Sequence, residues 1–162
     1  MKQTKITLPE IKLMGITART NNEAEMNLPK ARIGALLAQY HGDSIPKKTP
    51  NRLTPNKGFC AYTNYDSNED GDYTFFIGEE VDEFSNTSPD LTSLTIPNQS
   101  YIRFTTEAGP MPQIVIQAWQ KIWGMTSEDL GGERSYITDF EVYDERAADL
   151  TNAVVDIYIG LK

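Results

Sequence analysis

The sequence predicts an α+β fold in which a unit of strand, helix, strand and strand occurs twice along the chain. Two segments have the apolar spacing of amphipathic helices, and strand-like runs bounded by turn residues surround each of them. Short sequence matches between the two parts of the chain follow the same order. We therefore expect a tandem βαββ repeat with pseudo-two-fold symmetry, built from antiparallel sheets and two main helices.

The first repeat half is expected over residues 1–83. Its helix should run from Leu28 to His41, because apolar side chains recur there at intervals of three and four residues. Pro29 suits a first helical turn, and Gly42 suits the end of a helix. Three strand regions accompany this helix, over residues 6–20, 58–65 and 73–81.

A polar connector over residues 84–92 leads to the second half, which covers residues 93–162. The second helix is expected from Pro112 to Trp123, and Gly124 marks its end. Its strand regions are residues 94–106, 135–143 and 153–161.

Three short matches relate the halves: Ile6 to Pro9 with Leu94 to Pro97, Tyr65-Asp66 with Tyr143-Asp144, and Phe76 to Gly78 with Tyr158 to Gly160. A single βαββ unit cannot bury both its helix and its sheet, so the halves should close on each other as one domain over residues 1–162. A ligand cleft is expected between them, because binding sites commonly form at such junctions.

The charge of the chain excludes several classes of partner. The 162 residues include 15 Lys and Arg against 23 Asp and Glu, which gives a formal net charge of −8. Nucleic acids and anionic membranes attract proteins with an excess of cations, so neither is an expected partner. A cationic molecule is the kind of partner that this charge attracts.

The sequence predicts a cytoplasmic localisation. Cys60 is the single cysteine, so no internal disulfide can form and a reducing compartment is expected. The first ten residues lack the apolar run of a signal peptide, and no stretch approaches the ~20 apolar residues of a membrane span.

The stretch Asp66 to Gly71 matches the first half of an EF-hand calcium loop, but Ile77 stands where the bidentate Glu should be. The flanking segments are strand-like, so we expect a β-hairpin with Asp70-Gly71 at its turn. The residues required for a catalytic triad, a transition-metal site or a nucleotide cofactor are also absent, because His41 is the single histidine and no glycine-rich phosphate loop occurs. We expect no metal site, no cofactor and no catalytic residue.

Aromatic and acidic side chains remain as candidates for a binding site. Strand alternation places Phe140 and Val142 on one face, and Asp139, Glu141 and Tyr143 on the other. We expect Phe140 and Val142 to face the helices, which leaves Glu141 to line the central cleft. The alternative is a solvated surface carboxylate.

The same alternation puts Ala61, Thr63 and Tyr65 on the equivalent face of the first half, with Thr63 at the repeat position of Glu141. Further aromatic candidates are Trp119 and Trp123 on the second helix, and Phe76 and Tyr158 on the final strands of the two halves. Each of these rings belongs either to the core or to a ligand platform.

Together these segments resemble the GyrI-like domains, also called AraC-type effector-binding domains. The resemblance rests on the opening strand with Met14 to Ile16, the hairpin from Tyr62 to Thr74, the helix from Met111 to Trp123, and the strands 138–144 and 155–159. It implies a cleft that binds drug-like, often cationic and aromatic molecules. In that cleft a buried Glu, matched by Glu141, faces the ligand cation beside an aromatic ring matched by Tyr158. The regulators of this kind also carry a helix-turn-helix domain, so this chain is expected to be a free-standing effector domain.

The leading hypothesis is a binding module for amphipathic cations, with Glu141, Tyr158, Trp119, Trp123, Phe76, Tyr65 and Tyr143 as ligand-binding residues. Cation–π contacts of about 0.5–2 kcal/mol each would add to the attraction of the carboxylate. Two alternatives stay open. One is a GyrI-like hydrolase of electrophilic small molecules, in which Glu141 acts as general base. The other is a module that binds a basic protein through the acidic surface, as the gyrase-inhibitory members imply.

Overall fold

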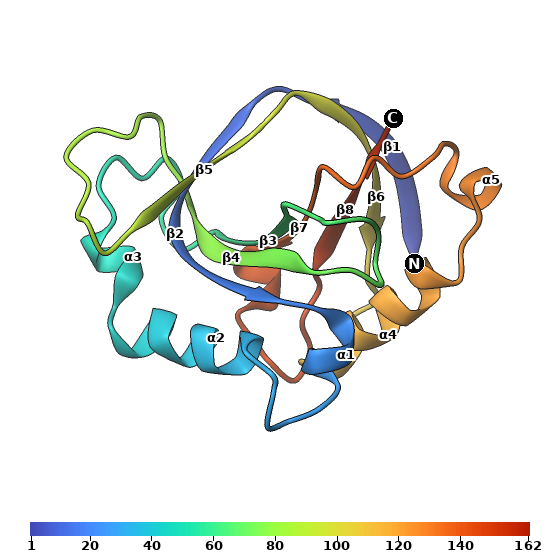
Figure 1. Ribbon diagram of the computed structural model, residues 1–162, viewed down its shortest axis with the longest axis horizontal. Coiled ribbons are helices and arrows are strands. Elements are labelled where there is room, and N and C mark those ends of the chain that lie inside the picture. Colours follow the sequence, from blue (N-terminus) through green and yellow to red (C-terminus); the bar gives the residue numbers. More distant parts are fainter.

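One antiparallel sheet of eight strands forms the core of the structure, a computed structural model that describes residues 1–162 (Figure 1). The strands are β1 (Lys2–Leu8), β2 (Ile11–Thr20), β3 (Gly58–Thr63), β4 (Tyr73–Glu80), β5 (Thr92–Ile96), β6 (Gln99–Thr105), β7 (Thr138–Tyr143) and β8 (Asp156–Leu161). The helices are α1 (Asn22–Glu25), α2 (Ile33–Gly42), α3 (Ile45–Lys48), α4 (Gln113–Trp123), α5 (Ser127–Leu130) and the 3₁₀ turn η1 (Glu145–Ala147). The predicted α+β class with antiparallel pairing is confirmed.

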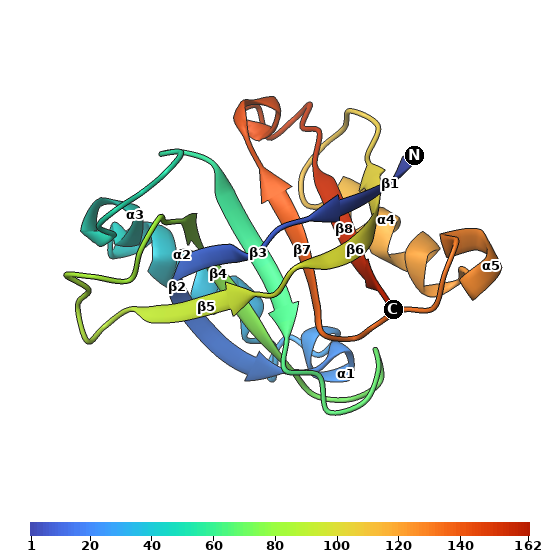
Figure 2. The same cartoon turned by 90° about the horizontal axis from the view of Figure 1, so that it is seen from above.

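The first strand region of each predicted unit forms two strands instead of one. Pro9 follows β1 and Pro97 follows β5, and a proline has no N–H with which to continue a strand ladder. The strands before the two corners pair with strands of the other half: β1 pairs with β6, and β5 pairs with β2. The strands after the corners also pair within their own half, β2 with β4 and β6 with β8. Each half of the chain therefore gives its first strand to the strands of the other half (Figure 2).

The strand order shows the predicted two-fold relation. The sheet runs β1-β6-β8-β7-β3-β4-β2-β5. If β1 to β4 are matched with β5 to β8, this order is the same from either end. The symmetry axis then falls between β7 and β3, which are paired antiparallel at the centre of the sheet.

The sheet has an inner face and a helix-covered face. Its two ends curl over the inner face (Figure 1), where the core includes Leu13, Phe59, Phe76 and Phe140. The helices lie on the other face. There α2 and α3 pack against one group of strand side chains, and α4 packs against another.

The predicted assignment of faces on β7 is wrong. Phe140 and Val142 belong to the inner core, so Glu141 points toward the helices. Alternation shows which side chains share a face, but it does not show which face the helices cover. Thr63 is not equivalent to Glu141, because the ladder places Thr63 opposite Thr138 on the inner face, whereas Glu141, opposite Cys60, lies on the helix-covered face. Cys60 is buried.

The second predicted helix is confirmed, while the first begins later than expected. In α4 the buried stripe consists of Val115, Ala118, Trp119 and Ile122. The helix predicted from Leu28 begins at Ile33, because the Glu25 carboxylate accepts hydrogen bonds from the backbone N–H groups of Arg32 and Ile33. No helix of the structure is both long and apolar enough to span a membrane.

The stretch from Asp66 to Gly71 lies in the loop that joins the antiparallel strands β3 and β4, as the hairpin interpretation predicts. The positive φ angle of this loop is at Asn64, at 50°, and not at Asp70-Gly71. The loop is fastened to β2, because Arg19 forms a 2.6 Å ion pair with Asp66.

Candidate ligand-binding site

A cavity of about 530 Å³ opens between the helices and the helix-covered face of the sheet. Its walls come from the α1–α2 segment, from α4, and from β3 and β4 with their connecting loop. The volume is within the range usual for small-molecule sites. Five aromatic side chains line it: Tyr62, Tyr65, Tyr73, Trp119 and Trp123.

The aromatic lining is continuous. The rings of Tyr62 and Trp119 meet edge to face with their centroids 5.0 Å apart, and Trp123 follows at 6.3 Å from Trp119. Three of the most exposed large apolar side chains also line the cavity: Met26, Leu28 and Ile116. A ligand that enters would therefore meet mostly apolar and aromatic surface, which favours a hydrophobic molecule.

Glu141 lies beneath this lining, with 2% of its surface exposed. Its Oε2 atom accepts a hydrogen bond of 2.8 Å from the Tyr62 hydroxyl and one of 2.7 Å from the Trp119 indole N–H. Its Oε1 atom accepts a hydrogen bond of 2.6 Å from the Tyr143 hydroxyl. Since Tyr62 and Trp119 also line the cavity, they connect the cavity wall directly to the carboxylate.

The partners of Glu141 are neutral hydrogen-bond donors. Burial raises the pKa of the Glu141 carboxyl above its usual value, and the three hydrogen bonds act in the opposite direction. Burial next to this carboxylate also raises the pKa of the Tyr62 and Tyr143 hydroxyls, so both remain protonated donors. In its ionised form, the Glu141 carboxylate is a negative charge removed from water and held by neutral donors alone.

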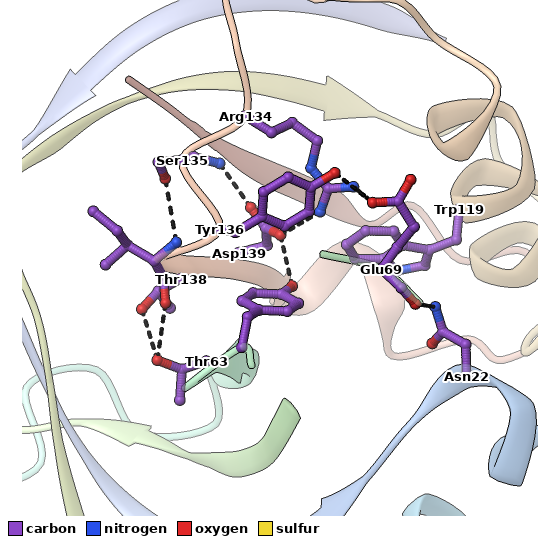
Figure 3. Close-up of polar contacts among 12 residues, drawn as sticks. Asn22, Thr63, Glu69, Trp119, Arg134, Ser135, Tyr136, Thr138 and Asp139 are labelled. Carbon is purple, nitrogen blue, oxygen red and sulfur yellow. Dashed lines mark hydrogen bonds and ion pairs between the residues drawn. The ribbon is translucent and has the colours of Figure 1, made fainter. Parts of the chain in front are cut away.

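A second polar group, centred on Arg134 and Asp139, lies where the segment before β7 lines one end of the cavity (Figure 3). The guanidinium of Arg134 forms a 2.6 Å ion pair with Asp139, which is fully buried. Asp139 also accepts hydrogen bonds of 2.7 Å from the Tyr65 hydroxyl and 2.8 Å from the Gly160 N–H. Although burial alone would lower the pKa of Arg134, the Asp139 charge raises it above its usual value.

Tyr136 holds Arg134 from the other side. Its ring lies 4.3 Å from the guanidinium carbon, and its hydroxyl donates a hydrogen bond to Glu69 in the β3–β4 loop. Tyr136 has a φ of 51°, which is rare for a bulky side chain and needs support from its surroundings. The arrangement ties the hairpin loop to the segment before β7.

The structure brings most of the expected site residues together. Trp119, Trp123 and Tyr65 line the cavity. Glu141 lies just behind the cavity wall, where it accepts the hydrogen bond from the Tyr143 hydroxyl. Tyr143 itself lines a separate cavity of about 300 Å³, next to Cys60.

Phe76 and Tyr158 do not join this site. Phe76 is in the inner core, and Tyr158 packs against the same core, where its ring stacks on Phe140 at 4.5 Å. Both side chains leave the sheet on the face opposite Glu141. The register explains this, because Tyr158 lies directly opposite Phe140 in the β7–β8 ladder and so shares its face.

Sequence reasoning missed Arg134, Tyr136 and Glu69 as parts of the site. Asp139 could have been found, because it lies two positions from Glu141 on the same strand face. The other three come from loops whose path depends on tertiary contacts. As to metals, no group of three or more His, Cys, Asp or Glu side chains lies close enough together to hold an ion.

Comparisons with known proteins give a consistent picture. A family model described as Cass2, integron-associated effector binding protein, matches residues 6–161. The protein YobU of Bacillus subtilis (strain 168), whose name assigns it provisionally to transcriptional regulators, is 31% identical over 149 residues. The match covers 91% of this chain and 90% of YobU.

Several solved structures have the same fold. The integron cassette protein VCH_CASS2 of Vibrio cholerae superposes with a TM-score of 0.78 at 25% identity, covering 99% of this chain and 95% of that protein. The protein SAV2435, solved bound to tetraphenylphosphonium, gives a TM-score of 0.77 at 17% identity, covering 100% of this chain and 94% of that protein.

Proposed function

This chain belongs to the Cass2 family of integron-associated effector-binding proteins, and we propose that its effectors are amphipathic cations that bind in the cavity next to Glu141. The resemblance to effector-binding domains, inferred from the sequence, agrees with this membership. The class of effector is inferred from the residues that form the cavity in this chain.

The buried Glu141 carboxylate carries the proposal. A carboxylate away from water is costly unless it is hydrogen-bonded or paired with a cation. Glu141 has three neutral donors, at 2.6 to 2.8 Å, that keep it in place. A positive ligand would add the missing opposite charge, in surroundings where the effective dielectric constant is lower than in water.

The aromatic lining supports the same class of ligand. Tyr62 and Trp119 present their rings to the cavity while their polar atoms bond to Glu141. Aromatic faces attract cations by about 0.5–2 kcal/mol per contact, and the hydrogen bonds to the carboxylate orient both rings. The binding of tetraphenylphosphonium by a protein of the same fold is consistent with a lipophilic cation.

Titration calorimetry of the wild-type chain with two matched biaryls tests this proposal. 1-Methyl-4-phenylpyridinium carries one positive charge, and 4-phenylpyridine at pH 8 has nearly the same shape without it. We expect the cation to bind at least tenfold more tightly, a difference of about 1.4 kcal/mol. Equal affinities for the two compounds, or binding of the neutral compound alone, would contradict the proposed class of ligand.

A further inference from the structure

We propose that Arg134 makes the cavity select ligands by their number of positive charges. Arg134 does so because it neutralises a second carboxylate, that of Asp139, beside Glu141. This inference rests on the proposed function, and it names a residue that sets specificity within the same cavity. In the wild-type protein the site should prefer ligands with one positive charge over ligands with two.

The two carboxylates belong to one strand face. Asp139 and Glu141 are two positions apart on β7, so their Cα atoms are about 7 Å apart and their side chains leave the sheet on the same side. Asp139 has no exposed surface and Glu141 has 2%. Both charges are therefore removed from water, under neighbouring parts of the same cavity.

The partners of the two carboxylates differ. Asp139 has a guanidinium 2.6 Å away, in addition to the Tyr65 hydroxyl and the Gly160 N–H. Glu141 is held by neutral donors alone. One carboxylate is thus already paired with a cation inside the protein, while the other awaits one from the ligand.

Arg134 is well placed to act on the ligand as well. Its side chain is 8% exposed and lines the cavity, while Tyr136 stacks on the guanidinium (Figure 3). Glu69 lies 3.8 Å from the same guanidinium, but its side chain is 31% exposed, so water screens its charge. A second positive charge on a ligand would approach Arg134, and like charges at close range repel in a desolvated site.

Removing the guanidinium should reverse this preference. Arg134→Met keeps most of the side-chain stem but leaves Asp139 with two neutral donors, the situation that Glu141 already has. The cavity then presents two buried carboxylates without a cationic partner. A ligand with two positive charges can pair with both, so its affinity should rise relative to that of a singly charged ligand.

The test compares two flat biaryls of nearly equal size. 1-Methyl-4-phenylpyridinium has one positive charge, and 1,1′-dimethyl-4,4′-bipyridinium has two. Their dissociation constants are measured by calorimetry for the wild type, for Arg134→Met and for the double variant Arg134→Met/Asp139→Asn. We expect Arg134→Met to shift the ratio of affinities at least tenfold toward the doubly charged ligand. The double variant, in which the second carboxylate is also gone, should return the ratio close to the wild-type value.

An unchanged ratio in a folded Arg134→Met protein would overturn the inference, and so would a double variant that keeps the shifted ratio. Wild-type protein that binds neither biaryl would instead contradict the proposed function itself. If Arg134→Met does not give a cooperative thermal melt, Asp139→Asn is tested instead, because this variant removes the carboxylate of the pair and keeps the guanidinium. It leaves Arg134 without its partner, so affinity for the singly charged ligand should fall at least tenfold, and an unaltered affinity would overturn the inference.

Discussion

Glu141 combines strong hydrogen bonds with the cost of burying a carboxylate. Hydrogen bonds to a charged group contribute about 1.5–3 kcal/mol each, and Glu141 accepts three of them. Burial nevertheless dominates, because the pKa of the carboxyl is raised overall. The ionised form is therefore less favourable in the folded protein than in the unfolded chain, a cost that the proposed ligand-binding role of Glu141 would explain.

This balance predicts the stability of Glu141→Gln in the absence of ligand. The raised pKa means that the folded state binds the proton more tightly, so the contribution to stability is present at acidic pH and lost as the pH rises through the raised value. Gln cannot titrate and keeps the shape of the side chain. We expect thermal melts to show a higher Tm for Glu141→Gln than for the wild type at pH 8, by about 2–4 °C per kcal/mol gained.

The Tm difference should shrink as the pH falls toward the ordinary range for a glutamate. Glu10→Gln provides the matched control, because Glu10 is exposed in the turn between β1 and β2. A Tm difference for Glu141→Gln that stays constant between pH 4 and pH 8 would mean that its carboxyl titrates normally in the folded state.

At the scale of single residues, alternation could predict that Glu141 and Phe140 point in opposite directions, and they do. It could not predict which direction leads to the cavity, since that depends on where the helices pack. For the same reason alternation could not show that Phe76 and Tyr158, which share the face of Phe140, point away from the site: Phe76 lies in the inner core and Tyr158 packs against it. Arg134 reaches the cavity from a loop, where no periodic pattern indicates the direction of a side chain.

Among the elements, β2 and β4 approach each other unusually closely at one pair of glycines. Gly15 lies opposite Gly78 in their ladder. A Cβ atom on Gly15 would overlap the Ile77 carbonyl oxygen, and one on Gly78 would overlap the Met14 carbonyl oxygen. The contacting atoms are backbone, so neither strand can yield by a change of rotamer.

Gly15→Ala is therefore expected to destabilise the protein by more than 3 kcal/mol, the scale of severe packing faults, or to prevent folding. Gly42→Ala is the control, because a Cβ there would meet nothing within 4 Å and the residue ends α2. Replacing a helical glycine by alanine stabilises by up to about 1 kcal/mol. Chemical denaturation measures both changes, and a Gly15→Ala protein as stable as Gly42→Ala would refute the close approach.

The predictability of the elements follows from where their stabilising partners lie. The stripe of α4 is encoded within the helix, so its bounds could be predicted closely. The start of α2 could not, because its first N–H groups bond to Glu25, which belongs to α1. The breaks in the first strand regions follow from Pro9 and Pro97, whereas the exchange of β1 and β5 depends on pairing between distant segments.

For the molecule as a whole, the exchange of β1 and β5 makes the two halves depend on each other. The inner core combines Leu13 and Phe59 from the first half with Tyr101 and Phe140 from the second. A separated half would lose one strand of its sheet and expose its part of this core. Burying such apolar surface is the main source of folding free energy.

We predict that fragments 1–83 and 84–162 do not melt cooperatively when they are alone. Mixed in equal amounts, they should form a one-to-one complex that melts cooperatively and has the circular dichroism spectrum of the intact chain. Analytical ultracentrifugation and thermal melts together test this. A fragment that folds stably by itself would show that the exchanged strand is not needed.

Glu141 is proposed to select cations, and a pair of titrations on two proteins tests this most directly. The wild type and Glu141→Gln are each titrated with 1-methyl-4-phenylpyridinium and with neutral 4-phenylpyridine at pH 8. Losing one partner of a desolvated charge pair costs about 2–5 kcal/mol, so the cation should bind Glu141→Gln at least 30-fold more weakly, while the neutral compound should bind both proteins alike. Equal losses for both compounds, or no loss for either, would show that the carboxylate does not select the ligand.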